Sequence, residues 1–193
     1  MSSSLHNGTN SEQVKLIIAD PHIIRDPVLQ KNNWYVQKAI RLDGTTLQYI
    51  EKQDSPLCVE AVLQNIEALQ YVKNKSELFY CMLVGADYKM LQYVDVQTDL
   101  ICLEAIKSSP EALGLIKKQT DTLCTLAVSR DGSVLQLVKK QSKLMIRIAL
   151  LQDPNNVKYV KRYNAKWVKF RRKLKLVSKS LGKTIRNQAT LVR

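Results

Sequence analysis

The stretch LQYVDVQTDLICLEAI, residues 91–106, holds the features that decide the fold. Its opening phrase, a leucine or valine followed three residues later by isoleucine or valine, returns every 22 residues without insertion or deletion. The phrase begins at Leu47, Leu69, Leu91, Leu113, Leu135 and Val157. A fixed period of this length predicts a solenoid, in which each repeat buries its apolar face only against its neighbours. Solenoids typically bind other macromolecules on an extended surface.

Two columns of polar residues predict where the helices of each repeat begin. Every position in them holds Asp, Asn, Ser or Thr, whose side chains accept hydrogen bonds from the free N–H groups at a helix start. The first column is Asp43, Asn65, Asp87, Ser109, Asp131 and Asp153, and the second is Asp54, Ser76, Thr98, Thr120, Ser142 and Asn164. We therefore expect two helices of about eight or nine residues in each repeat. Asp20-Pro21 is a further expected helix start.

The apolar residues have helical spacing. After the second column, Ile101/Cys102 and Ala105/Ile106 lie at positions i, i+1, i+4 and i+5, which share one side of a helix but no face of a strand. Leu69 and Val72, with their equivalents, form a matching stripe after the first column. The sequence predicts an all-α protein: an N-terminal segment and cap at 1–31, an α-solenoid of about six two-helix repeats at 32–163, and a basic amphipathic tail at 164–193.

The net charge of +13 is confined to the C-terminal end of the chain. Residues 1–153 contain 17 basic and 17 acidic side chains, whereas residues 154–193 contain 13 Lys or Arg and no Asp or Glu. This distribution predicts a neutral scaffold with a strongly basic end, and the basic end indicates an acidic partner.

The tail combines apolar and basic residues in a helical pattern. Its apolar residues recur at spacings of three and four and form the expected docking stripe: Trp167, Phe170, Leu174, Val177 and Leu181. Basic residues surround this stripe, which predicts a basic amphipathic helix. The stripe either caps the last repeat or docks on a partner. A role as a cap on the last repeat does not explain why residues 154–193 contain no Asp or Glu.

A column of basic residues also lies at the end of the second helix of the repeats. Its basic character increases toward the C-terminus, and it joins the tail in one candidate patch. Cations near a helix C-terminus offset the helix dipole, so a purely structural role is the alternative. The candidate partner-binding patch comprises Lys139, Lys140, Lys161, Arg162, Lys166, Lys169, Arg171, Arg172, Lys173, Lys175, Lys179, Lys183 and Arg186.

Three kinds of partner fit such a patch. One is the phosphate backbone of a nucleic acid, bound without sequence preference because no base-reading motif is present. Another is an anionic membrane surface. The third is an acidic surface on a protein.

Two further columns and the cysteines fit packing roles. Tyr49, Tyr71, Tyr93 and Tyr159 form an aromatic column, beside a glutamine column at Gln48, Gln70, Gln92 and Gln136. Either column packs between repeats or lines a surface. Cys58, Cys102 and Cys124 fall on the apolar stripe and Cys81 lies one position away, at spacings unlike those of zinc ligands. We expect reduced thiols in the core of an intracellular protein.

No motif indicates catalysis. The chain has no P-loop, no G-x-S-x-G and no H-E-x-x-H, and both histidines precede the predicted array. We therefore expect a protein that is not an enzyme and takes no cofactor and no small-molecule substrate. No signal peptide and no apolar window of membrane-spanning length are present, so we expect no membrane span.

The phrases LQYVKNKSELFYCMLV and LQYVDVQTDLICLEAI resemble a family of short helical repeats of unknown function that is abundant in giant DNA viruses of amoebae, such as mimiviruses and marseilleviruses. The resemblance covers residues 34–160, and Gly85 and Ala86 depart from it, as does the tail. It implies a viral origin and a repeat scaffold without catalysis, located in the host cytoplasm, the virus factory or the virion.

These observations favour a scaffold that binds other proteins, as a minor capsid or capsid-associated component of a giant virus. In this role the tail anchors on an acidic protein partner. A sequence-independent nucleic-acid-binding protein that packages a genome is the main alternative. An adaptor that captures a host protein on the solenoid is another.

Overall fold

The computed structural model describes residues 10–161 and Arg172. Every regular element among residues 10–161 is helical, as expected for an all-α protein. The chain divides into two compact units, Met1–Asp87 and Tyr88–Arg193. Each is described by itself below.

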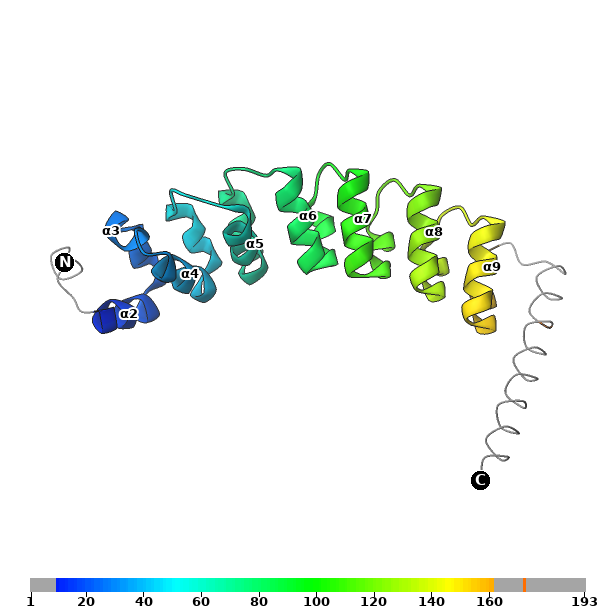
Figure 1. Ribbon diagram of the computed structural model, residues 1–193, viewed down its shortest axis with the longest axis horizontal. Helices are drawn as coiled ribbons and strands as arrows, with labels where there is room; N and C mark the ends of the chain where they lie inside the picture. Colours follow the sequence, from blue (N-terminus) through cyan, green and yellow to red (C-terminus); the bar gives the residue numbers. More distant parts are fainter. Residues whose placement is uncertain (1–9, 162–171, 173–193) are drawn as a thin grey trace, which may run out of the picture. The chain divides into compact units, whose positions relative to one another are not determined.

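The first unit begins with α2 (Asn10–Ala19), the 3-10 helix η1 (Pro21–Arg25) and the short α3 (Pro27–Gln30). Pairs of an α-helix and a 3-10 helix follow: α4 (Asn33–Leu42) with η2 (Gly44–Tyr49), α5 (Ser55–Gln64) with η3 (Ile66–Tyr71), and then α6 (Glu77–Ala86). Helices α3, α4, α5 and α6 each contact the next, and so do η1, η2 and η3. The unit therefore has an α-helical layer and a 3-10 layer, with α2 packed on η1 and α4 (Figure 1).

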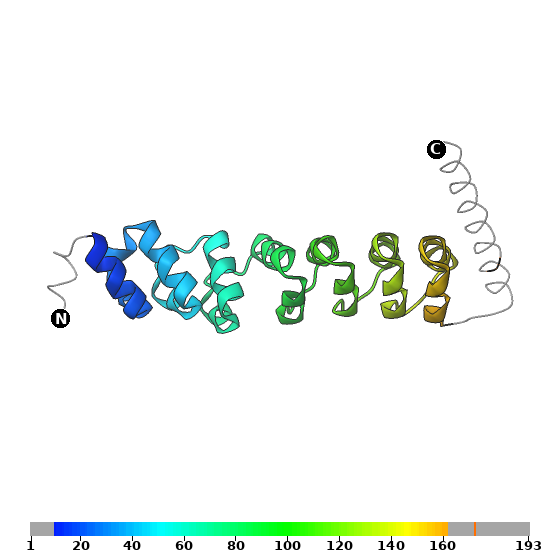
Figure 2. The ribbon, with the colours of Figure 1, turned by 90° about the horizontal axis from the view of Figure 1, so that it is seen from below.

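The second unit repeats this arrangement. It contains η4 (Tyr88–Tyr93), α7 (Asp99–Ser108), η5 (Pro110–Gly114), α8 (Asp121–Arg130), η6 (Gly132–Leu137), α9 (Lys143–Gln152) and η7 (Pro154–Tyr159). Helices α7, α8 and α9 lie side by side, and the 3-10 helices form a second row along them (Figures 1 and 2).

The expectation of two similar helices in each repeat was wrong in one respect. The helix after the second polar column is an α-helix of 10 residues, whereas the helix after the first column is a 3-10 helix of five or six residues. The physical reason lies in packing across the repeat and not in the apolar spacing. Leu135 and Val138 are buried and three residues apart, a spacing that fits both a 3-10 helix and an α-helix.

The predicted caps are confirmed at five residues of each column. Caps of the second column, which begin α-helices, accept from the backbone N–H three residues ahead, as Asp54 does from Leu57. Caps of the 3-10 helices accept from the N–H two residues ahead, as Asp43 does from Thr45. The cap predicted at Asp20 is also present and begins η1. Asn164 lies outside the described residues.

The core lies between the two layers of each unit. Its largest side chains include Phe79 and Leu83 in the first unit and Leu113 and Ile116 in the second. Small residues keep the layers close together, and Ala61 and Ala149 have no exposed surface. A Cβ at Gly132 of η6 would lie 2.9 Å from the Cα of Ala149 in α9, so this contact requires glycine.

Candidate partner-binding surface

Within each unit, a column of glutamine side chains ties each 3-10 helix to the next. Gln119 Nε2 donates hydrogen bonds to the carbonyl oxygens of Leu113 and Leu137, each at 3.0 Å. Its Oε1 accepts from the backbone N–H of Lys139 at 2.8 Å. The corresponding three bonds are made by Gln30, Gln53, Gln97 and Gln141. Each amide therefore satisfies backbone groups that two 3-10 helices leave open at their ends.

Sequence reasoning missed this glutamine column and singled out a different one. The glutamines that it named, Gln48, Gln70, Gln92 and Gln136, are all exposed. The signal for the structural column was a glutamine directly before the second cap column, at residues 53, 97, 119 and 141. Lys75 occupies the same register between them.

In the basic column, one lysine of each repeat binds the backbone of the preceding repeat, at residues 73, 117, 139 and 161. Lys161 Nζ donates to the carbonyl oxygen of Val138 at 2.7 Å, and Lys139 Nζ donates to that of Lys117 at 3.0 Å. Lys73 and Lys117 make equivalent bonds. These ammonium groups offset the partial negative charge of carbonyls at the end of a 3-10 helix. Lys139 and Lys161 therefore have a structural role in addition to their predicted place in the binding patch.

The rest of the predicted patch is described only in part. Lys140 is exposed and forms no hydrogen bond or ion pair with the other described residues. Arg172 is also exposed. The other predicted patch and docking residues lie outside the described part of the chain: Arg162, Lys166, Trp167, Lys169, Phe170, Arg171, Lys173, Leu174, Lys175, Val177, Lys179, Leu181, Lys183 and Arg186.

Positive charge accumulates before the tail begins. Residues 132–161 contain six Lys or Arg and one acidic residue, Asp153. Lys140, Lys143 and Arg147 of this segment are exposed. The basic surface therefore includes α9 and the turn before it.

The tyrosine column lies at the ends of the 3-10 helices and takes part in the glutamine contacts. The carbonyl oxygens of Tyr49, Tyr71 and Tyr159 accept from Gln30, Gln53 and Gln141. Three of the four rings are half-buried, and Tyr93 is 41% exposed. The column is thus largely a packing feature.

The cysteines occupy the positions that their spacing predicts. Cys58, Cys102 and Cys124 are buried, and Cys81 is half-buried. Burial, together with the nearby carboxylate of Asp54, raises the pKa of the Cys58 thiol to about 11. The Cys58 thiol donates to Gln53 Oε1 at 3.7 Å, and Cys124 makes the same contact with Gln119. These thiols support the glutamine column from the α-helical layer.

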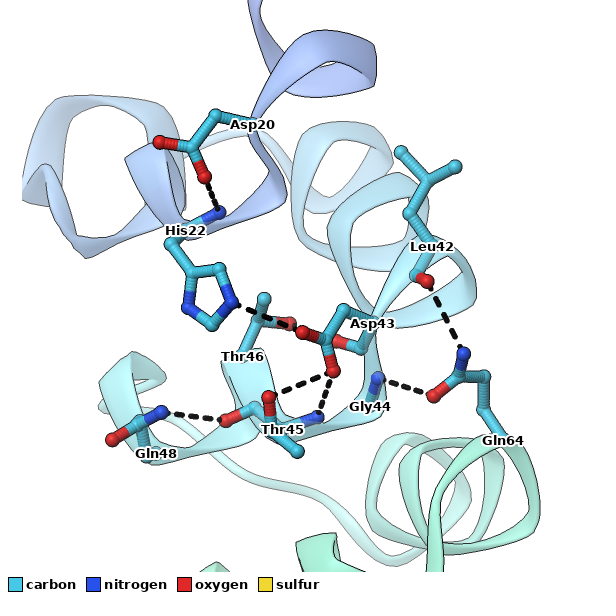
Figure 3. A network of polar contacts seen from close by, with 9 residues as sticks. All are labelled: Asp20, His22, Leu42, Asp43, Gly44, Thr45, Thr46, Gln48 and Gln64. Atoms are coloured by element: carbon cyan, nitrogen blue, oxygen red, sulfur yellow. Dashed lines mark hydrogen bonds and ion pairs between the residues drawn. The ribbon is translucent and has the colours of Figure 1, made fainter.

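A polar network joins the N-terminal helices to the first α-helix/3-10 pair (Figure 3). His22 Nε2 lies 3.0 Å from Asp43 Oδ2, and the hydroxyl of Thr45 donates to Asp43 Oδ1 at 2.7 Å. Burial raises the pKa of Asp43, but the hydrogen bonds from Thr45 and His22 outweigh it, so the net pKa is lowered. Gln64 Oε1 accepts from the N–H of Gly44, and its Nε2 donates to the carbonyl oxygen of Leu42 at 3.1 Å. Each polar group of this network has a partner that stabilises the fold.

No family model, no curated protein and no solved structure matches the chain. Function is therefore inferred from the geometry and charge of the described repeats. Within residues 10–161 no helix is long and apolar enough to cross a membrane. The same part of the chain holds no group of three His, Cys, Asp or Glu side chains placed to bind a metal ion.

One hollow of about 590 Å³ lies in the first unit, between α3, α4 and the start of α5. Its charged residues are of both signs, with Lys31 and Lys52 near Glu51, Asp54 and Glu60. Arg41 Nε donates to Glu60 Oε1 at 2.6 Å, which neutralises one of these carboxylates. The hollow thus presents a mixed surface, in contrast to the basic surface at α9.

Proposed function

We propose that the chain is a non-catalytic α-solenoid scaffold of about six 22-residue repeats, which binds other proteins and anchors on an acidic partner through its basic tail. The observation that supports this proposal best is the glutamine column, together with the lysines that follow each 3-10 helix. These side chains are used to join one repeat to the next, as at Gln119 and Lys139. Because these polar contacts lie at the ends of the 3-10 helices, they do not cover the outer faces of the α-helices, which remain available to partners.

The charge distribution supports the basic anchor. Residues 1–153 are neutral overall, and all of the excess charge follows residue 153. A basic segment next to a neutral scaffold steers the protein toward acidic surfaces and orients it on them.

We also propose that the chain belongs to the giant-virus repeat family that residues 91–106 resemble, and that it is a capsid-associated component of the virion. The resemblance and the 22-residue period support this assignment. Mass spectrometry of purified virions tests the proposed virion role, with a lysate of infected cells as the reference. Peptides of this chain should be enriched in the particles. Peptides found in the lysate alone would contradict a virion role.

A matched pair of full-length variants tests the tail. One variant replaces Lys166, Lys169, Lys173 and Lys175 by Gln; the control replaces four exposed lysines of the first unit: Lys15, Lys31, Lys52 and Lys75. Both variants lose the same net charge. We expect poly-glutamate to bind the control variant and the unmodified chain equally, and the tail variant at least tenfold more weakly. Equal binding by both variants would show that the tail is not the anchor.

Genome packaging is the second candidate function, because 13 basic residues without an acidic one also fit a phosphate backbone. The same proteins are titrated with a DNA duplex at several salt concentrations. Duplex binding that is tighter than poly-glutamate binding, depends steeply on salt and vanishes in the tail variant would favour packaging over the scaffold.

A further inference from the structure

Helix α9 has apolar side chains on two opposite sides. Met145, Ile146, Ala149 and Leu150 are buried on the side that faces the 3-10 layer. On the outer side, Leu144 is 58% exposed and Leu151 is 60% exposed. Residues seven apart return to the same side after two turns, about 10 Å along the axis. These two leucines therefore form a pair on the outer surface, which folding of the described chain leaves largely uncovered.

Basic side chains flank this pair. Lys143 and Arg147 are exposed and lie on the same side of α9 as Leu144 and Leu151, and exposed Lys140 precedes the helix. Neither Lys143 nor Arg147 has an ion pair within the described residues. The sequence of α9 contains no acidic residue.

The equivalent surfaces of the neighbouring helices differ. Leu100 of α7 occupies the same repeat position as Leu144 and is 48% exposed, but Asp99 and Glu104 accompany it. In α8 this position is the polar Thr122. Within α7, α8 and α9, only α9 combines exposed leucines with basic residues alone.

We propose that the outer face of α9 docks an acidic amphipathic helix of a partner protein. Leucines of the partner helix pack on Leu144 and Leu151, and its carboxylates pair with Lys140, Lys143 and Arg147. Amphipathic helices are commonly recognised by apolar anchors one and two turns apart. A phosphate backbone offers no apolar surface for the two leucines, so the combination fits a protein better than a nucleic acid. The inference deepens the proposed scaffold function by naming a docking surface outside the tail.

The test uses the full-length chain and a synthetic 21-residue peptide of Leu and Glu, with the leucines at helical spacings of three and four. An isomer of equal composition with scrambled leucines reports charge alone. Fluorescence anisotropy gives the affinity of each peptide for the unmodified chain, for the double variant L144S/L151S and for the control L100S. The tail is unchanged in every protein. We expect the amphipathic peptide to bind L144S/L151S about tenfold more weakly than the other two proteins.

Two results would overturn the proposal. One is equal affinity for the two peptides, which would reduce binding to charge. The other is unchanged binding by L144S/L151S. A DNA duplex and the variant K143Q/R147Q test the nucleic-acid alternative. This face would be assigned to nucleic acid if K143Q/R147Q bound the duplex more weakly and the leucine changes left peptide binding unaffected. Because the tail variant is measured separately, failure of the tail anchor and failure of the α9 surface give different patterns.

Discussion

At the scale of single residues, Gln119 shows how one side chain joins neighbouring repeats. Its amide donates to Leu113 and Leu137 and accepts from the backbone of Lys139. An asparagine is one methylene shorter and does not span the same three groups. A hydrophobic residue of similar size provides none of the three side-chain hydrogen bonds. The side chain is thus chosen for its reach and for its ability both to donate and to accept.

We expect Gln119→Ala to lower the free energy of unfolding by about 2 kcal/mol, because three hydrogen bonds of roughly 0.5–1.5 kcal/mol each are lost. Guanidinium denaturation monitored by circular dichroism measures the change. Gln136→Ala is the matched control, since Gln136 is exposed. It should leave the midpoint almost unchanged. A Gln119→Ala variant as stable as Gln136→Ala would show that solvent replaces these bonds without cost.

The buried thiols give a second prediction at this scale. The pKa of Cys58 is raised by burial to about 11 from an ordinary 9.0, and burial also raises the pKa of Cys102 and Cys124. The unfolded chain therefore loses these protons at lower pH than the folded chain. The contribution of the protonated Cys58 thiol to the free energy of unfolding is therefore fully present below pH 9.0. It is lost as the pH rises toward 11.

Alkylation by iodoacetamide at pH 8, followed by peptide mass spectrometry, tests the thiols directly. We expect the three buried cysteines to react at least tenfold more slowly in the native protein than in guanidinium, since only the exposed thiolate reacts. Cys81, which is half-buried, serves as the internal comparison. Rapid native alkylation of Cys58 would contradict its buried position.

At the scale of elements, the sequence predicted where helices begin more reliably than what kind of helix follows. Cap residues such as Thr120 and Ser142 act through their own side chains, so their positions can be read from the sequence. The choice between an α-helix and a 3-10 helix depends on packing across the repeat. The apolar pair Leu135 and Val138 is three residues apart and is compatible with both helix types.

Features that depend on a single helix could be predicted from the sequence, whereas features that depend on two helices could not. Burial of Cys102 followed from its place in an apolar stripe of one helix. The role of Gln97 did not, because its partners Leu91 and Leu115 belong to two different 3-10 helices. The sequence shows that glutamine recurs directly before the second cap column. Only the folded chain shows that its amide lies between the ends of two 3-10 helices.

Two glycines provide a prediction about the spacing of elements. A Cβ at Gly132 would lie 2.7 Å from Asn156 Nδ2 and 2.9 Å from the Cα of Ala149, so η6 and α9 would have to separate. We expect Gly132→Ala to lower the free energy of unfolding by about 1–3 kcal/mol. Gly85→Ala is the control, because a Cβ at this exposed position in α6 meets nothing within 4 Å. It should raise stability by about 0.5–1 kcal/mol.

Guanidinium midpoints of the two alanine variants are compared with that of the unmodified chain. Opposite signs are expected for Gly132→Ala and Gly85→Ala, although both add one methyl group. If both variants were stabilised, η6 and α9 would not approach as closely as described.

At the scale of the whole molecule, the contacts that join the described repeats are local, whereas the charge is distributed unevenly along the sequence. The hydrogen bonds that join repeats connect residues about one repeat apart, as Gln152 to Val128 and Ser129. The excess charge of +13, by contrast, arises entirely after residue 153. Stability is therefore distributed along the described repeats, while the excess positive charge is concentrated at one end of the sequence.

Because the contacts between repeats are local, we expect a substitution to destabilise only the repeats next to it. In a chain whose repeats contact only their neighbours, loss of one contact lowers the stability of adjacent repeats and leaves distant ones unchanged. Native-state hydrogen exchange of Gln119→Ala, read by mass spectrometry, tests this. Amide protection should fall in η5, η6 and α8, the elements around Gln119, and remain unchanged in α4 and η2. A uniform loss of protection from α4 to α9 would mean that the described chain unfolds as one cooperative unit, because each local defect would then lower the stability of every repeat equally.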